Sequence, residues 1–344
     1  MTITISGSSI NFGTYSLEIS DTGISLTNTG TLYANAFTDL HPNVMGQIEG
    51  YNAGGLVPPY TNTIDKFPFS SPFAITDVGD LSSVRFTLAP QSSSSNGYFS
   101  GGTVPPVTPI NSIDSFPFST PFATATDAGD LSQSRSEASG QSSSTEGYTS
   151  GGFAPPFSNT IDKFPFSTPF TTASDVGDLT QAKNRLSGHS SATEGYNSGG
   201  NLPSQTNVIE KFPFSTPVSV SDIGDLAQSK YFHTSHSSKL YGFSAGGSIF
   251  TPSTRINTIE RFPFSTPFTT ASGIGYLSQS RDRAGSQNST TEGYTSGGTL
   301  TPPAPTPANN INTIDKFPFT TRFITATDVG DLADNRTDVS GNQY

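Results

Sequence analysis

The chain of 344 residues contains no cysteine and no tryptophan, and only 12% of its residues are charged. The lack of cysteine excludes disulfide scaffolds, cysteine-ligated zinc sites and cysteine nucleophiles. Sixteen Lys and Arg stand against 27 Asp and Glu, which gives a net charge of −11. No basic patch is present to neutralise phosphates or an anionic membrane surface, so we do not expect a nucleic-acid partner.

Long apolar runs are also missing. No stretch approaches the roughly 18 residues of a membrane-spanning helix, and membrane insertion is not expected. Residues 1–13 lack the basic and apolar regions of a secretory leader, so no signal peptide is predicted. By contrast, phenylalanine is abundant, with 26 copies. A disordered chain would be poor in aromatic residues, so we expect a folded protein with a polar, mostly uncharged surface.

An internal repeat dominates the sequence. The motif I-[DE]-x-F-P-F begins at Ile64, Ile113, Ile161, Ile209, Ile259 and Ile314. A Gly-Gly pair after a Gly-Tyr or Gly-Phe ends at residues 55, 102, 152, 200, 247 and 298. A leucine, mostly in the context V-G-D-L, recurs at residues 81, 131, 179, 226, 277 and 332. The leucine always precedes the next Gly-Gly end by 21 residues, whereas the stretch from Gly-Gly to isoleucine varies from 9 to 16.

Each repeat predicts four short strands. In the third unit we expect strands over residues 135–143, 146–151, 159–166 and 170–175, because these runs are bounded by Gly, Pro and Ser. The proline of F-P-F cannot donate to a ladder and should lie at a strand end or a sheet edge. Four strands in about 48 residues, repeated six times, are typical of a β-propeller.

The landmarks resemble the kelch repeat, in which a hydrophobic strand ends in Gly-Gly. Phe164 and Phe170 stand near the places where a kelch repeat has tyrosine and tryptophan, and the lack of tryptophan is a departure. The resemblance covers residues 47–344 and implies a six-bladed, kelch-like β-propeller over residues 46–344. The expected blade cores contain Phe67, Phe116, Phe164, Phe212, Phe262 and Phe317.

The two ends of the repeat complement each other. The C-terminal segment stops at the point in the repeat where the segment from Gln47 begins. We therefore predict that residues 336–343 pair with the strand near Gln47 and close the first blade; an open stack with capping repeats is the alternative. Residues 1–45 lie outside the repeat, and strands at 2–5, 15–19 and 23–26 predict a small β-element there.

No metal or cofactor site is predicted. The four histidines (residues 41, 189, 233 and 236) lack a repeated ligand spacing and are interpreted as polar strand positions. The paired acids of D-x-G-D are interpreted as turn formers, with cation ligands as the alternative, because the fifth unit has Gly273 and Tyr276 instead.

One acid and one basic residue recur in every unit. The acids are Asp65, Asp114, Asp162, Glu210, Glu260 and Asp315, and the bases are Arg85, Arg135, Lys183, Lys230, Arg281 and Arg336. We expect the acids and bases to pair structurally, with an axial ring of positive charge as the alternative. A single active site would need one unusual blade, and no catalytic triad appears, so no enzyme is predicted.

The variable connection from Gly-Gly to isoleucine is the candidate binding surface. All six copies should emerge on one face, where proline stiffens them and aromatic side chains suit binding; free drift of surface loops is the alternative. The candidate ligand-binding residues are Tyr60, Phe153, Phe157, Phe250, Arg255, Asn309 and Asn310.

The repeat wording NTIDKFPF, ATDVGDL and GQSSSTEGYTSGG resembles kelch-like repeats of tailed bacteriophages, especially cyanophages. The resemblance implies a virion structural protein in a tail fibre or surface appendage, assembled in the host cytoplasm. Residues 1–45 would attach it to other virion proteins, and the loop face would contact a host glycan or protein; a homo-oligomer is possible. The alternatives are a purely structural decoration or adaptor subunit and, third, a polysaccharide-degrading enzyme.

Overall fold

The computed structural model describes residues 9–12, 15–20, 23–27 and 48–343, with gaps at 57–59, 71–72, 120–121, 168–169, 216–217, 252, 266–267, 302–308, 321 and 323–324. The chain is all-β, and its described residues contain no α-helix. Among these residues, accordingly, no helix is long and apolar enough to cross a membrane.

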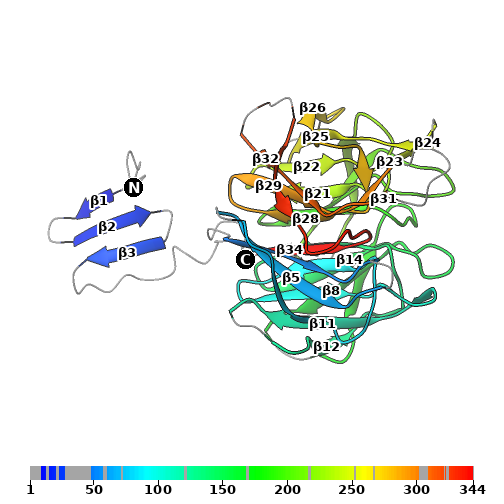
Figure 1. The fold of residues 1–344 in the computed structure, drawn as a ribbon, viewed down its shortest axis with the longest axis horizontal. Helices are drawn as coiled ribbons and strands as arrows, with labels where there is room; N and C mark the ends of the chain where they lie inside the picture. Colours follow the sequence, from blue (N-terminus) through cyan, green and yellow to red (C-terminus); the bar gives the residue numbers. More distant parts are fainter. Residues whose placement is uncertain are drawn as a thin grey trace.

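Six four-stranded antiparallel sheets lie in the described part of the repeat region (Figure 1). The first contains β34 (Ser340–Gln343), β4 (Glu49–Ala53), β5 (Thr63–Pro68) and β6 (Thr76–Asp80). The second contains β7 (Ala89–Ser92), β8 (Asn96–Ser100), β11 (Ser112–Pro117) and β12 (Thr126–Asp130). The third contains β13 (Ser139–Ser142), β14 (Glu146–Ser150), β15 (Thr160–Pro165) and β16 (Ser174–Asp178).

The fourth sheet contains β17 (Ser187–Ser190), β18 (Glu194–Ser198), β19 (Val208–Pro213) and β20 (Ser221–Asp225). The fifth contains β21 (Thr234–Ser237), β22 (Tyr241–Ala245), β25 (Thr258–Pro263) and β26 (Ser272–Tyr276). The sixth contains β28 (Gly285–Asn288), β29 (Glu292–Ser296), β32 (Thr313–Pro318) and β33 (Thr327–Asp331). In every sheet the F-P-F proline is the last residue of the third strand, as predicted for a residue without a backbone donor.

A separate three-stranded sheet precedes the repeats. It contains β1 (Ser9–Phe12), β2 (Tyr15–Ser20) and β3 (Gly23–Thr27), all antiparallel. The strands predicted at 15–19 and 23–26 are therefore confirmed, whereas β1 was not predicted. The strand expected at 2–5 lies outside the described residues.

Two strand predictions in the repeat were wrong in their bounds. The first strand of the third sheet begins at Ser139 rather than Arg135, because Glu137 has a φ of 53° and turns the preceding segment away from the ladder. The fourth strand begins at Ser174, so it contains the D-x-G-D segment that was expected to form a turn.

The C-terminal strand completes the first sheet. β34 pairs with β4, with Ser340 opposite Ala53 and Gln343 opposite Gly50. The predicted pairing of the two chain ends is therefore confirmed. It joins residues almost 300 positions apart and gives the first sheet the same four strands as the others.

The first strands of the six sheets contact one another in a closed order. β7 contacts β13, then β17, β21, β28 and β34 follow in turn, and β34 contacts β7 again. Aromatic side chains repeat this order further out. An aromatic residue from each second strand, tyrosine in five sheets and Phe243 in the fifth, packs against the two F-P-F phenylalanines of the next sheet. Tyr148, for example, lies against Phe212 and Phe214 with centroids 5.6 and 4.8 Å away.

A glycine precedes this aromatic residue in each second strand, and the packing of a phenylalanine ring against it excludes a larger residue. A Cβ on Gly147 would lie 2.4 Å from the ring of Phe164, which is too close for any side chain. The first F-P-F phenylalanine therefore lies flat on the bare backbone of its own sheet. All six phenylalanines expected in the core are buried, with relative exposures of 0%.

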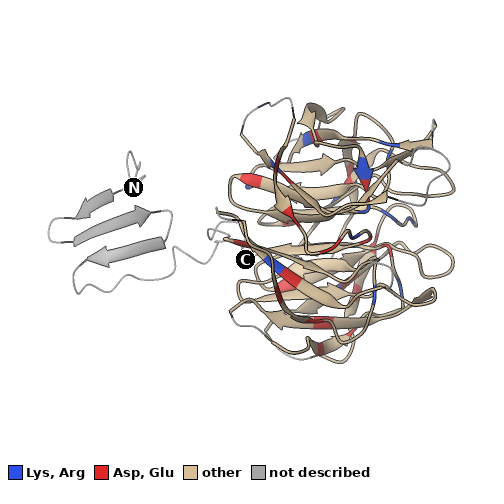
Figure 2. Cartoon of the chain, in the orientation of Figure 1, with Lys and Arg blue, Asp and Glu red and all other residues tan. Residues whose placement is uncertain are grey.

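The recurring acid and base form a buried ion pair in every sheet, and structural pairing is confirmed. The pairs are Arg85–Asp114 (2.6 Å), Arg135–Asp162 (2.8 Å), Lys183–Glu210 (2.6 Å), Lys230–Glu260 (3.8 Å), Arg281–Asp315 (2.8 Å) and Arg336–Asp65 (2.7 Å). Figure 2 shows how few other charges the sheets carry. The alternative, an axial ring of positive charge, is wrong because each cation is neutralised within its own sheet.

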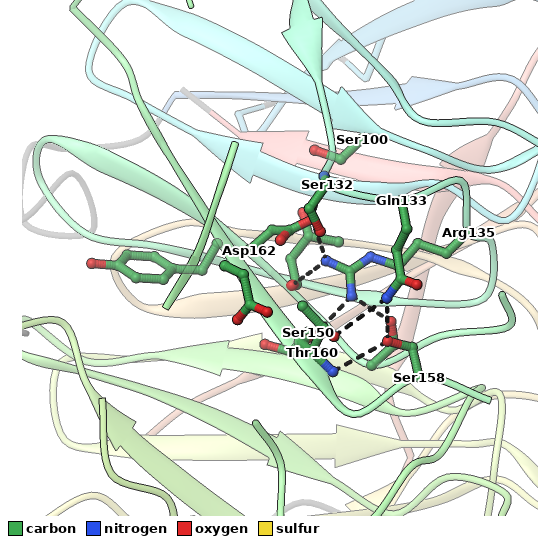
Figure 3. Close-up of polar contacts among 12 residues, drawn as sticks. Ser100, Ser132, Gln133, Arg135, Ser150, Ser158, Thr160 and Asp162 are labelled. Atoms are coloured by element: carbon green, nitrogen blue, oxygen red, sulfur yellow. Dashed lines mark hydrogen bonds and ion pairs between the residues drawn. The ribbon is translucent and has the colours of Figure 1, made fainter. Parts of the chain in front are cut away.

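Each pair ties the segment before the first strand to the third strand, and Arg85, Arg135 and Arg281 also donate to carbonyls of the second strand. Figure 3 shows this around Arg135, whose guanidinium pairs with Asp162. The same group donates to the carbonyl oxygens of Thr149 (2.9 Å), Gly151 (3.1 Å) and Thr160 (2.8 Å). One buried guanidinium group thus donates hydrogen bonds to carbonyl oxygens at the end of β14 and at the start of β15.

The two lengths in each pair are matched. The units with Arg carry Asp, and the two units with Lys carry Glu. The ammonium group of lysine is compact and has fewer donors than guanidinium. The longer side chain of glutamate places its carboxylate close to this group. The pair therefore varies as a unit.

We expect Asp162→Ala to destabilise the protein by about 3 to 5 kcal/mol, because it leaves the buried Arg135 without its counter-charge. Urea denaturation measures the change. Lys163→Ala, next to it on β15, is the control: Lys163 pairs with Glu146 while about a fifth exposed, at 22%, and should lose less than about 1 kcal/mol. Arg135→Lys combined with Asp162→Glu should recover stability relative to Arg135→Lys alone; equal losses at positions 162 and 163 would contradict the assignment.

Candidate functional site

Three of the four histidines occupy buried positions, and His41 lies outside the described residues. His189 and His236 stand at the third position of β17 and β21, where other first strands carry Gln91, Gln141 or Gln287. All of these side chains reach into the next sheet: Gln141 donates to the Asn197 side chain (2.7 Å), and His236 contacts the Gln287 carbonyl through Nδ1 (3.2 Å). At these two positions histidine connects neighbouring sheets as glutamine does elsewhere. This agrees with their interpretation as polar strand positions.

Burial changes the titration of these histidines. It lowers the pKa of His189 to about 3 and that of His236 to about 4, against hydrogen bonds to backbone carbonyls that act to raise them. The pKa of His233 also lies well below its ordinary value because of burial, with Lys230 adding to the effect. All three are therefore neutral at physiological pH.

The D-x-G-D acids serve a β-bulge. In each fourth strand one extra residue faces the third strand, for example Val78 between Asp77 and Gly79. The Asp77 carboxylate accepts a hydrogen bond from the Gly79 N–H (3.0 Å), and Gly79 has a φ of 147°, which only glycine adopts easily. The fifth sheet has the same bulge without the acids. No group of three potential metal ligands occurs among the described residues.

The six variable connections lie on one face, because each continues from the end of a second strand. The first residue of each connection pairs with the segment that leads into a first strand, as Phe153 does with Ser136 and Ser248 with Tyr231. Short hairpins follow in the connections: β9 (Thr103–Val104) with β10 (Thr108–Pro109), and β23 (Ser248–Phe250) with β24 (Ser253–Arg255). In the sixth unit, β30 (Thr299–Leu300) joins β31 (Asn309–Asn310) and β27 (Arg281–Asp282).

The aromatic candidate residues contact the segments that lead into first strands, or contact one another. The ring of Tyr60 stacks on Phe86 with centroids 4.9 Å apart, and Phe250 packs on Tyr231 at 4.6 Å while staying 41% exposed. Phe153 and Phe157 contact each other edge to face, at 6.1 Å.

Two of the candidates are occupied by structural contacts. Arg255 pairs with Asp282 (2.6 Å) and donates to the Leu300 carbonyl (2.9 Å), so its charge is already neutralised. Asn310 donates to the Leu56 carbonyl (3.2 Å) and joins the sixth connection to the first, whereas Asn309 is exposed. The aromatic candidates and Asn309 are thus accessible on this face, and Arg255 holds the face together.

A ring of backbone hydrogen bonds lies at the centre of the same face. We call its six members the rim residues: Thr87, Glu137, Arg185, Phe232, Arg283 and Asp338. Each N–H donates to the carbonyl of the preceding member, and Thr87 closes the ring on Asp338; the distances run from 2.8 to 3.2 Å. All six have φ between 53° and 58° although none is glycine. Left-handed backbone at non-glycine residues stores strain, and such strain clusters at functional sites.

The rim side chains are of five residue types, with arginine in two of the six sheets. Glu137 pairs with Arg185 (3.0 Å), and the Arg185 guanidinium lies 4.7 Å from the centre of the Phe232 ring. Arg283 lies 4.2 Å from that ring centre and pairs with Asp338 (3.2 Å). Five rim side chains thus form one continuous chain of contacts.

Two cavities lie inside the circle of first strands. A polar cavity of about 160 Å³ is lined by residues of β7, β13, β17, β21, β28 and β34. A second cavity of about 100 Å³ opens at the rim residues and is lined beneath them by the next layer, which includes Leu88, Leu186 and His233. We call this second space the mouth cavity. It lies on the same face as the variable connections, because each rim residue follows a segment paired with a connection.

The rim residues were not among the residues predicted from sequence. Their signal is present, since each lies six residues after the repeat leucine, where the aligned units read Thr, Glu, Arg, Phe, Arg and Asp. The columns on either side also vary between units, so the signal is the fixed distance from the leucine and not a contrast with constant neighbours.

In comparisons with known proteins, no family model matches the chain, and no curated protein sequence is similar enough to match it.

We expect His236→Gln to remove a part of the acid sensitivity of the fold. The folded pKa of His236, about 4, lies below the ordinary 6.5, so stability from neutral histidine is complete above pH 6.5 and is lost as pH falls toward 4. The difference in unfolding free energy between pH 7 and pH 4.5 should shrink by about 2 to 3 kcal/mol in the variant.

Urea denaturation at the two pH values measures this difference. The reverse change, Gln141→His at the equivalent position of β13, should add acid sensitivity. An unchanged pH dependence in His236→Gln would show that this histidine is not protonated on unfolding in this range.

Proposed function

We propose that the repeat region is a six-bladed, kelch-like β-propeller. The proposal is supported by the closed order of first strands, by the rim ring of six backbone hydrogen bonds and by the C-terminal strand that completes the first sheet. Each four-stranded sheet would be one blade, and the mouth cavity would be the axial opening.

We further propose that the protein is a non-enzymatic component of a phage virion, in a tail fibre or surface appendage, that binds a host-surface glycan or protein. The observation that carries a binding role is the contrast between faces: sequence variation, exposed aromatic rings and a cavity all coincide on the variable-connection face. The virion location rests on the resemblance of the repeat to phage sequences. Residues 1–45 would supply attachment to other virion proteins.

The opposite face offers no comparable diversity. There the first and second strands of the second to sixth sheets are joined by short turns held in the same way, as where Ser143 caps Glu146 and Ser191 caps Glu194. A uniform face suits assembly or exposure to solvent, whereas a face that differs between repeats can match an irregular ligand.

We expect the purified protein to compete with phage particles for adsorption to host cells, and Phe250→Ser to weaken this competition about tenfold, as for the loss of one aromatic anchor. Competition in an adsorption assay measures it. Leu240→Ser is the control, because Leu240 is equally apolar and exposed (59%) but lies in a turn between first and second strands.

Mass spectrometry of purified particles tests the virion location, and absence of the chain would contradict it. Presence in particles without any competition would favour a decoration or adaptor subunit. Release of reducing ends from host polysaccharide would favour the enzymatic alternative.

A further inference from the structure

The mouth cavity combines three features that the rest of the face lacks. It has a volume of about 100 Å³, several times the space that a single water needs. Its rim is built from strained left-handed residues. Its side chains include two arginines, two acids and one aromatic ring, contributed by five different sheets. A ligand that enters here meets side chains that no single repeat could supply.

The two rim arginines sandwich one aromatic ring. Arg185 and Arg283 lie 4.7 and 4.2 Å from the centre of Phe232, which fixes both guanidinium planes beside the opening. Phe232 is thereby occupied and leaves no free face for stacking. Any ligand is therefore held by the guanidinium groups and not by the ring.

Each arginine uses only part of its donor set on the protein. Arg185 donates through Nε to Glu137, and no described residue accepts a hydrogen bond from its Nη atoms. Arg283 donates through Nη1 to both carboxylate oxygens of Asp338. Their side chains are 29% and 34% exposed and both residues line the cavity, although the Nε of Arg283 is itself buried without a hydrogen-bond partner. A guanidinium held on one edge by an acid is already oriented for a second acceptor.

The charges at the rim favour the ionised form of Arg283. Burial acts to lower the pKa of Arg283, but Asp338, Asp282 and, more weakly, Glu137 outweigh it and raise that pKa. The Asp338 carboxyl is fully buried and its own pKa is raised by burial, against the effect of Arg283. Asp338 lines the cavity with its carboxylate against Arg283 (3.2 Å), which offsets its charge at the opening.

Beneath the rim, one polar side chain interrupts an apolar layer. The equivalent positions of the other five sheets are Leu88, Ala138, Leu186, Ala284 and Val339, and the fifth sheet has His233. His233 is 6% exposed and lines the cavity; its Nε2 contacts Ser198 (3.0 Å), but its buried Nδ1 has no hydrogen-bond partner. A buried polar atom without a partner costs free energy unless a ligand or water satisfies it.

We infer that the mouth cavity binds the carboxylate-bearing end of an acidic sugar, with the carboxylate against the Nη groups of Arg185 and a hydroxyl group beside His233. The inference rests on the proposed surface-binding function and names its ligand class. It also moves the expected contact from the exposed aromatic residues of the connections to the centre of the face.

The experiment compares two probes that differ only at one carbon: D-glucuronate, which carries a carboxylate, and D-glucose, which carries a hydroxymethyl group. Isothermal titration calorimetry of the full chain should detect glucuronate binding that weakens with added salt, and binding of glucose at least about tenfold weaker. Arg185→Gln should reduce glucuronate affinity at least about tenfold. Arg261→Gln is the matched control, since Arg261 also packs on an aromatic ring, Tyr241, at 4.4 Å, but is not among the residues that line the mouth cavity.

Equal binding of the two sugars, binding of neither, or full affinity in Arg185→Gln would overturn the inference. The comparison of probes uses the unaltered protein and does not depend on how any variant folds. Failure here is separable from failure of the proposed function: competition for host adsorption that persists without glucuronate binding leaves the surface-binding role intact. Glucuronate binding without host competition would support the cavity and contradict the proposed function.

Discussion

The buried ion pair in each sheet is the contact on which the remaining structure depends. It neutralises the only fully buried cation of the unit and satisfies backbone carbonyls at the ends of two strands, as Arg135 does for Thr149, Gly151 and Thr160. The segment that carries this cation then passes directly into the rim residue. The position of each rim residue therefore depends on a charge pair buried shortly before it in the chain. Without that pair, the backbone that leads to the rim residue would not be held in place.

Much of the fold follows from the sequence because the repeat makes local chemistry visible six times. The pairing of the chain ends could be predicted from the complementary segments alone, and β34 with β4 confirms it. The F-P-F strand end could be predicted from the missing donor of proline. The fourth strand was misplaced because D-x-G-D has the composition of a turn. In the structure the glycine instead serves a bulge, and the aspartate caps it within a strand.

The candidate site was predicted only in outline. The variable connections are evident from their unequal lengths, and Tyr60 and Phe250 do lie exposed or part-exposed on their face. The contacts that occupy Arg255 could not be predicted, because Asp282 belongs to another repeat and becomes its neighbour only in three dimensions. The rim residues were missed for a related reason: each is one unremarkable residue in its own unit, and they form a set only when the sheets are arranged in a circle.

The rim ring separates the tasks of backbone and side chain at one position. The backbone N–H and C=O groups make the contacts between sheets at the rim. The ring of hydrogen bonds therefore requires of each side chain only that it tolerates a left-handed φ. The position accepts threonine, phenylalanine, two acids and two arginines with the same backbone geometry. Duplication of a repeat therefore copies the backbone framework, while the rim residue of each copy can be substituted independently. In the proposed binding role, single substitutions at the rim would alter the ligand contacts of this opening without any change of the backbone ring.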